Sequence, residues 1–181
     1  TISDISTGQL LEVFGCLIDA KDPYTGGHSR RVAALAEAVA GQLGFDEEIQ
    51  RTARAAGYLH DLGKVSVPLR ILTKTERLAP DERIEIQRHP AAGAEILESI
   101  PILEGLVPAC RYHHERWDGS GYPEGMSGDR IPLMAQILAV CDSYDAMTSG
   151  RAYRASRSHG HAMEEIDRES GGQFGPRVVG G

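Results

Sequence analysis

Apolar side chains recur every three or four residues along most of the chain, and this spacing constrains the fold more than any other feature. It is clearest in segment 28–43, where the apolar positions are Val32, Leu35, Ala36, Val39 and Leu43. The same helical spacing runs through segments 2–20, 46–64, 103–114 and 133–147, and no pair of segments shows the alternation typical of strands. The sequence therefore predicts an all-α fold, a compact helical bundle.

Glycine, proline and acidic residues mark the expected helix ends. Gly44 stands where a C-terminal cap belongs, and Asp46 opens a helix that we expect to continue through residues 60–64. Because the residue before a proline avoids the helical region, Pro90 predicts a helix end ahead of it and a new helix after it. A last short helix is expected over 158–169, before a glycine-rich tail.

The chain has 181 residues, of which 41% are hydrophobic, and this suffices for one compact domain. We expect residues 1–20 to form an N-terminal linker or dimer helix, and 21–181 to form the functional domain. The formal net charge of −7 argues against broad contact with a nucleic acid polymer. A small anionic ligand remains compatible with it, if cations gather in one pocket.

Three cysteines, Cys16, Cys110 and Cys141, stand far apart and in no metal-binding spacing. They favour a reducing compartment, and neither a membrane-spanning run nor a signal peptide is visible. We therefore expect a cytoplasmic protein or the cytoplasmic part of a larger one. The chain begins at Thr1, which is compatible with an upstream sensory or receiver domain.

Imidazoles and carboxylates are spread one or two to a predicted helix, and a helical bundle can direct such residues into one cavity. The seven candidate metal ligands are His28, His60, Asp61, His89, His113, His114 and Asp142. Without a thiolate in motif spacing, the set favours iron, manganese or zinc. Two ions that share a bridging aspartate would use so many ligands better than one ion, and such a pair suits phosphoryl chemistry.

Lys64 follows His60 by four residues and Asp61 by three, so on a continuous helix it would share their face. A cation there would stabilise negative charge on a phosphate. A single histidine in a helix is more often a surface or core residue, and His159 and His161 are expected to face solvent. The glycine-rich loop 116–132 is either a functional wall or a plain surface connection.

Together these motifs resemble the HD-GYP family, a branch of the HD-domain metal-dependent phosphohydrolases. Gly121-Tyr122-Pro123 separates this branch from generic HD nucleotidases. The matching segments are Asp22-Pro23-Tyr24-Thr25 with His28-Ser29, His60-Asp61-Leu62-Gly63-Lys64, His89-Pro90, His113-His114-Glu115-Arg116-Trp117-Asp118-Gly119-Ser120-Gly121-Tyr122-Pro123, and Asp142-Ser143-Tyr144-Asp145-Ala146-Met147-Thr148-Ser149 with Arg151-Ala152-Tyr153-Arg154.

The resemblance implies hydrolysis of cyclic di-GMP, a bacterial second messenger, to pGpG or GMP by attack of a metal-bridging hydroxide. It implies a two-metal centre bridged by Asp61, with Lys64 binding the phosphate. The implied metals are iron or manganese, with zinc, nickel or magnesium as alternatives. The implied ligands are His60, Asp61, His89, His113, His114 and Asp142.

Other roles carried over from the family concern the substrate. Arg151 and Arg154 correspond to arginines that contact a guanine or a phosphate, and Asp145 to a residue that orients Lys64 or the attacking water. Tyr122 would shape one wall of the pocket, and its loop is also a candidate contact for a protein partner.

Two departures from the family pattern are informative. Some members hold a third metal with a glutamate four residues before the position of His28, where this chain has Tyr24. A tyrosine ordinarily keeps its proton at neutral pH, so we expect two metals, with His28 peripheral or at a weak third site. Near the end, Phe174-Gly175-Pro176 replaces the usual Phe-Asp-Pro, which predicts altered packing there.

Two other functions stay open on the sequence alone. One is a cyclic dinucleotide receptor that binds its ligand with little turnover. The other is a phosphodiesterase for a different cyclic dinucleotide. A homodimer through the first helix is a further expectation.

Overall fold

The structure, a computed structural model, describes residues 6–22, 26–149 and 156–180. Within these ranges the regular elements are helices, which confirms the predicted all-α class. The elements are α1 (Thr7–Lys21), α2 (His28–Gln42), α3 (Glu47–Leu59), η2 (Leu62–Ser66), α4 (Leu69–Leu72), α5 (Pro80–Ile86), α6 (His89–Glu98), η3 (Pro101–Leu106), α7 (Val107–Tyr112), η4 (Gly128–Arg130), α8 (Leu133–Thr148), α9 (His159–Arg168) and α10 (Pro176–Val179), where η marks a 3-10 helix.

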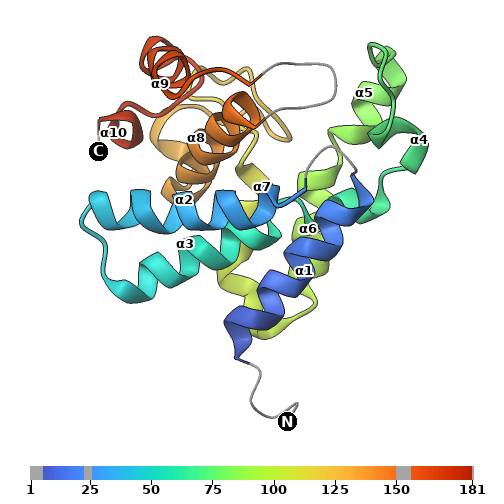
Figure 1. The fold of residues 1–181 in the computed structure, drawn as a ribbon, viewed down its shortest axis with the longest axis horizontal. Helices are drawn as coiled ribbons and strands as arrows, with labels where there is room; N and C mark the ends of the chain where they lie inside the picture. Colours follow the sequence, from blue (N-terminus) through green and yellow to red (C-terminus); the bar gives the residue numbers. More distant parts are fainter. Residues whose placement is uncertain (1–5, 23–25, 150–155, 181) are drawn as a thin grey trace.

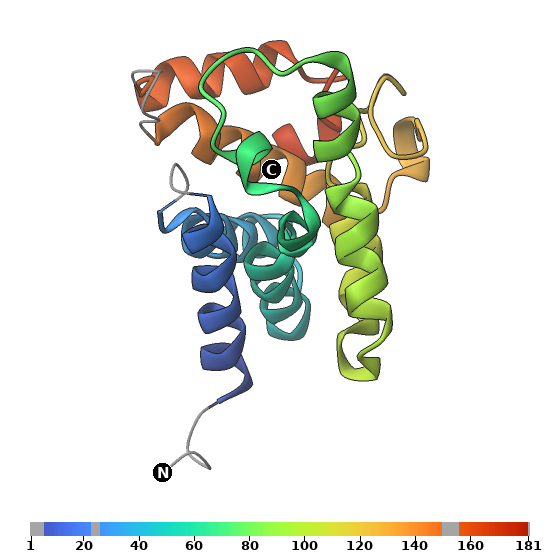
Figure 2. The same ribbon diagram turned by 90° about the vertical axis from the view of Figure 1, so that its right-hand side faces the viewer.

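Helices α2 and α3 pack side by side at the centre of the bundle (Figure 1). Helix α8 crosses them, and α9 covers α8 on the side away from α3. Turned by 90°, α1 and α6 stand on opposite sides of α3 (Figure 2). No helix in the described ranges combines the length and apolar character needed to cross a membrane.

Local sequence signals explain several helix starts. Ser6 caps α1 in a reciprocal pair with Gln9, each side chain bonding the other's backbone amide. Asp46 caps α3 by accepting from the amide of Ile49, and Ser158 caps α9. These caps satisfy amides that the helix itself leaves without partners.

Four predicted boundaries were wrong. Helix α3 ends at Leu59, and the 3-10 helix η2 follows it, so no continuous helix carries residues 60–64. Helix α6 begins at His89 and takes Pro90 into its first turn, where a proline costs no hydrogen bond. Segment 103–114 divides into η3 and α7, and the glycine-rich tail contains α10.

Small residues let α2 and α3 approach closely. Ala33, Ala36, Ala53 and Ala56 are fully buried between them. At Gly57 an added Cβ would lie 2.7 Å from the backbone nitrogen of Ala33, which is too close for any side chain. The close approach matters for function because α3 ends at the first residues of the predicted metal site.

Gly63 is the point where η2 presses on α6. A Cβ placed at Gly63 would overlap the carbonyl oxygen of His89 and lie 2.5 Å from the backbone nitrogen of Gly93. Neither neighbour is a flexible side chain, so α6 would have to move. The glycine of the His-Asp-x-Gly-Lys segment is therefore needed for contact with the helix that carries His89.

Helix α1 contacts the bundle through one face only. Ile18 and Gly15 are buried against α2 and α3. The other face leaves four large apolar side chains about half exposed: Leu10 (46%), Val13 (54%), Phe14 (50%) and Leu17 (63%).

Replacing Gly63 with alanine is expected to lower the free energy of unfolding by about 2 kcal/mol or more, because the added methyl group meets backbone. Denaturant unfolding monitored by circular dichroism would measure the change. Gly41→Ala is the matched control, since its Cβ would meet only the Gln50 side chain at 3.4 Å. Equal stability of the two variants would contradict the role given to Gly63.

Candidate metal centre

The seven candidate ligands converge at one place in the bundle, and most of them come from helix ends. His28 opens α2, His60 and Asp61 follow α3, and His89 opens α6. His113 and His114 follow α7, and Asp142 projects from α8. Helix ends from different layers thus meet around one buried volume. His28, His60, His89 and His113 are each at most 2% exposed.

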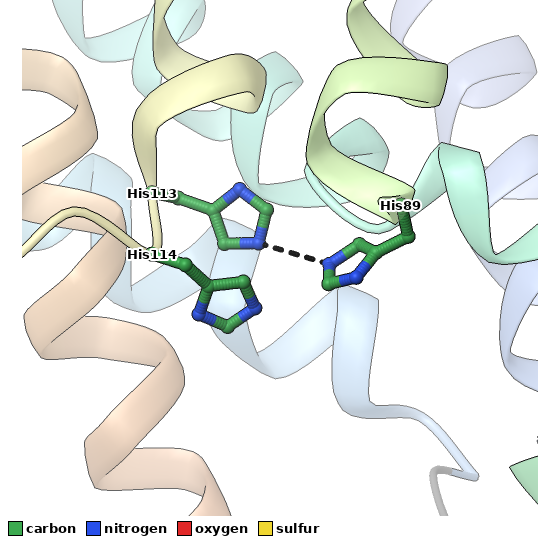
Figure 3. Close-up of side chains that lie close together, drawn as sticks. All are labelled: His89, His113 and His114. Atoms are coloured by element: carbon green, nitrogen blue, oxygen red, sulfur yellow. Dashed lines mark hydrogen bonds between the residues drawn. The ribbon is translucent and has the colours of Figure 1, made fainter. Parts of the chain in front are cut away.

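Six of these residues form two groups of three, each compact enough for one ion. One group is His28, His60 and Asp142, and the other is His89, His113 and His114; in each, the donor atoms lie within 4.8 Å of one another. Figure 3 shows the second group, with the three rings directed toward a common point. The Nε2 atoms of His89 and His113 are 3.4 Å apart.

Asp61 lies between the two groups and faces both. Its Oδ1 is 3.2 Å from Nε2 of His89, in one group. Its Oδ2 is 3.5 Å from Nε2 of His60 and 3.7 Å from Nε2 of His28, in the other. A carboxylate with one oxygen toward each group has the geometry of a bridging ligand.

His28 belongs to the centre and does not lie at its edge. Its Nε2 is 3.3 Å from Nε2 of His60 and 3.4 Å from Oδ1 of Asp142. Of the two expectations for His28, a peripheral position does not fit these distances, and a weak third metal site stays a prediction. The expectation of a peripheral position followed from the absence of a glutamate at position 24. The place of His28 depends instead on how α2 starts against α3 and α8.

Backbone carbonyls set the orientation of three imidazole rings in the same way. Nδ1 of His60 lies 2.9 Å from the Gly57 carbonyl oxygen, and Nδ1 of His113 lies 2.7 Å from that of Cys110. His89 repeats the contact with Ile86, also at 2.7 Å. A carbonyl only accepts, so Nδ1 carries the proton and Nε2 presents a lone pair to the cluster.

The protonation states of these groups suit cation binding at neutral pH. Burial lowers the pKa of His60 and of His113, and brings that of His114 to about 3, so these three imidazoles are neutral. Burial would lower the pKa of His28 too, but its bond to Asp145 and the charges of Asp142 and Asp61 raise it above its usual value. Burial alone would raise the pKa of Asp61, but the charge of Lys64 holds it well below its usual range. Neutral imidazoles and a carboxylate fit a divalent cation, and this donor set could hold two.

Lys64 reaches Asp61 although no continuous helix joins them. Its Nζ lies 2.6 Å from Oδ2 of Asp61 and 3.9 Å from Oδ2 of Asp22. Burial disfavours the charged ammonium, but Asp61 outweighs it and raises the pKa of Lys64, which stays a cation. The side chain is 16% exposed, so it lies at the rim of the centre.

Asp145 pairs with other residues than expected. One oxygen accepts from Nδ1 of His28 at 2.8 Å, and both accept from Arg31, at 2.5 and 3.1 Å. Burial would raise its pKa, but His28 and Arg31 lower it to about 2. Asp145 thus fixes the ring of His28, in the way that outer carboxylates orient metal-binding histidines. Its expected role, to orient Lys64 or the attacking water, stays a prediction.

The glycine-rich loop is fixed beside the second histidine group. Buried Glu115 accepts from the amides of Glu124 and Met126, at 2.7 and 2.9 Å. The ring of Tyr122 lies over that of His114, with centroids 4.8 Å apart. Sequence reasoning singled out Tyr122 but assigned no role to Glu115, which directly follows the two histidines.

The tail packs against the same loop. The amides of Trp117 and Asp118 donate to the carbonyls of Gln173 and Gly172, at 3.1 and 2.8 Å. Gln173 also accepts from Arg116 and donates to Ser143. Gln173, Arg116 and Ser143 line a cavity of about 220 Å³ that is also lined by His114, Tyr122 and Asp142. Sequence reasoning missed Gln173, since nothing local in the tail points to the site.

Some of the predicted residues lie outside the site or outside the described ranges. Arg151, Arg154 and Tyr24 lie outside the described residues. His159 and His161 are exposed, as predicted. The buried thiols of Cys110 and Cys141 have a raised pKa, because burial disfavours the thiolate.

The sequence is similar to a known protein family and to proteins of known activity. The sequence model of the HD domain matches residues 12–178. A cyclic di-GMP phosphodiesterase from Thermotoga maritima is 38% identical over 173 residues, which cover 94% of this chain and 47% of that protein. The 3'3'-cGAMP-specific phosphodiesterase 3 of Vibrio cholerae is 40% identical over 147 residues, 81% of this chain and 32% of that protein. The chain thus spans less than half the length of these relatives.

Solved structures agree on the fold. The crystal structure of a cyclic GMP-AMP-specific phosphodiesterase of V. cholerae, V-cGAP3, superposes with a TM-score of 0.75 at 18% identity, covering 96% of this chain and 47% of that one. The family match over most of the chain, the Gly121-Tyr122-Pro123 loop and the two histidine groups agree with one another. The chain belongs to the HD domain family, in its HD-GYP branch.

Proposed function

We propose that this chain is a metal-dependent phosphodiesterase that hydrolyses cyclic di-GMP. The observation that carries the proposal is Asp61, whose two oxygens face two separate groups of three donors. This arrangement fits a pair of divalent ions on one phosphodiester. The relatives named as cyclic di-GMP phosphodiesterases support the choice of substrate.

The residues of the chain would divide the work as follows. His28, His60 and Asp142 would hold one ion, His89, His113 and His114 the other, and Asp61 both. Bound ions would supply a water of lowered pKa and neutralise charge on the phosphate. The oxygen of water adds to phosphorus as the bond to the 3′ oxygen breaks. A proton from water passes to the leaving 3′ oxygen, so that the ring opens to linear pGpG with a 5′ phosphate and a 3′ hydroxyl.

Lys64 would act on the phosphate itself. Its ammonium is at the rim of the centre and is held by Asp61, so it can approach a non-bridging oxygen as charge develops there. Tyr122, beside His114, would form part of the wall against which the substrate lies. Arg151 and Arg154 are proposed to contact a guanine or a phosphate.

We further propose two ions per chain, iron or manganese, since Tyr24 stands where a third site would need a carboxylate. Zinc, nickel and magnesium are the alternatives. The cytoplasm is the proposed location, and an upstream sensory or receiver domain the proposed source of control. The exposed apolar face of α1 is compatible with a homodimer, and the loop around Tyr122 with a protein partner.

A second substrate has a specific observation in its favour. The relative named 3'3'-cGAMP-specific phosphodiesterase 3 is as similar as those named for cyclic di-GMP. Incubating manganese- or iron-loaded protein with each dinucleotide, and separating products by chromatography, ranks the two. Tight binding of cyclic di-GMP without product would refute the hydrolase and indicate a receptor.

Asp61→Asn is expected to lower kcat at least about 100-fold, because the amide loses the charge shared by the two groups. Product formation from cyclic di-GMP measures the effect, and circular dichroism verifies the fold. Asp129→Asn, on an exposed residue of the loop, is the control and should keep full activity. Full turnover by Asp61→Asn would contradict the bridging role.

Metal analysis of anaerobically purified protein should return two ions per chain. His114→Ala should reduce this to about one, since it removes a donor from one group and leaves the other intact. His159→Ala replaces an exposed histidine and should leave two. Three ions in the wild-type protein would overturn the predicted count, and loss of both in His114→Ala would show that the groups do not bind independently.

A further inference from the structure

Lys21 is the last residue of α1, and its side chain joins that helix to the segment that carries Lys64. Its Nζ donates to the carbonyl oxygens of Lys64 at 2.9 Å, Val65 at 2.5 Å and Val67 at 2.8 Å. All three carbonyls belong to η2 or to the residue that ends it. We propose that Lys21 is a positioning residue for the reaction, because it fixes the backbone from which Lys64 reaches the phosphate.

The chemistry of a helix end explains why a lysine suits this place. The last carbonyls of a helix lack a full set of partners within it, and the short helix η2 leaves several of them at one spot, where that of Lys64 also accepts from the amide of Val67 at 3.1 Å. An ammonium has three donor hydrogens, so one side chain can satisfy three carbonyls at once. The same charge is favourable at a helix C-terminus, where the carbonyl dipoles gather.

The next residue extends the contact from backbone to side chain. Oδ2 of Asp22 lies 3.9 Å from Nζ of Lys64. Nζ also forms an ion pair with Oδ2 of Asp61, at 2.6 Å. The end of α1 therefore meets Lys64 twice, through its carbonyl and through its ammonium. Between them, Lys21 and Asp22 define both where the Lys64 backbone lies and where its charge is directed.

The other side of η2 is held by a different helix. Gly63 packs directly on the backbone of His89 and Gly93 in α6. The segment is thus clamped between α1 and α6. Loss of Lys21 releases the α1 side only, and the donors on α6, α7 and α8 keep their positions, so Lys64 should shift while the ions stay bound.

The test rests on the proposed hydrolysis and uses Lys21→Met, which keeps the length of the side chain but removes its donors. We expect kcat to fall roughly 10- to 100-fold, the range for a displaced catalytic group, with KM and bound metal little changed. Lys21→Arg, which restores a cation with several donors, should recover part of the rate. Arg54→Met, which removes a cation pairing Glu37 across α2 and α3, is the control and should keep kcat.

A double-mutant cycle with Lys64→Met separates positioning from general damage. If Lys21 acts through Lys64, then Lys21→Met causes no further loss of kcat when Lys64 is already methionine. The proposal is overturned if Lys21→Met alone leaves kcat unchanged, or if it lowers kcat by the same factor in both backgrounds. Should Lys21→Met fail to fold, Lys21→Gln takes its place.

The two proposals fail in different ways. A wild-type protein that binds cyclic di-GMP without turnover refutes the hydrolase, and the same cycle measured on the dissociation constant then tests whether Lys21 positions Lys64. A wild-type protein that hydrolyses cyclic di-GMP, with a cycle that is additive, refutes the positioning role alone.

Discussion

The buried carboxylate of Asp61 is the interaction on which the rest of the structure depends. A charge removed from water is tolerated only when other groups compensate it. Here the ammonium of Lys64 does so, with Nζ 2.6 Å from Oδ2 of Asp61. The imidazoles of His60 and His89 lie 3.5 and 3.2 Å away with a lone pair toward the carboxylate, so bound cations would supply the rest of the compensation. Because these partners lie on separate elements, the helix ends must meet at one point. The same charge would hold two cations side by side, one at each oxygen of the carboxylate.

Much of the fold was predictable because the longer helices carry local sequence signals. Apolar spacing identified α2 and α8, and the acidic start of α3 identified its cap. The ligand set was predictable from residue type and from the resemblance to a known family. In both cases, the information lies within a few residues of the feature.

What could not be predicted depends on contacts between distant segments. Helix α3 stops at Leu59, and η2 then turns so that Gly63 can press on α6. The place of His28 in the centre and its bond to Asp145 arise from the packing of α2 on α8. Lys21 gives no signal in the sequence, since its partners are backbone carbonyls more than forty residues away.

The convergence of helix ends also bears on the lifetime of the folded chain. The donors run from His28 to Asp142, so a bound ion would tie together segments that are far apart in sequence, as a cross-link does. Ligands that bind only the folded state stabilise it in proportion to the logarithm of their concentration. Scarcity of the metal in a cell would then remove the protein by exposing it to proteolysis, and the supply of cations would set how much of it survives.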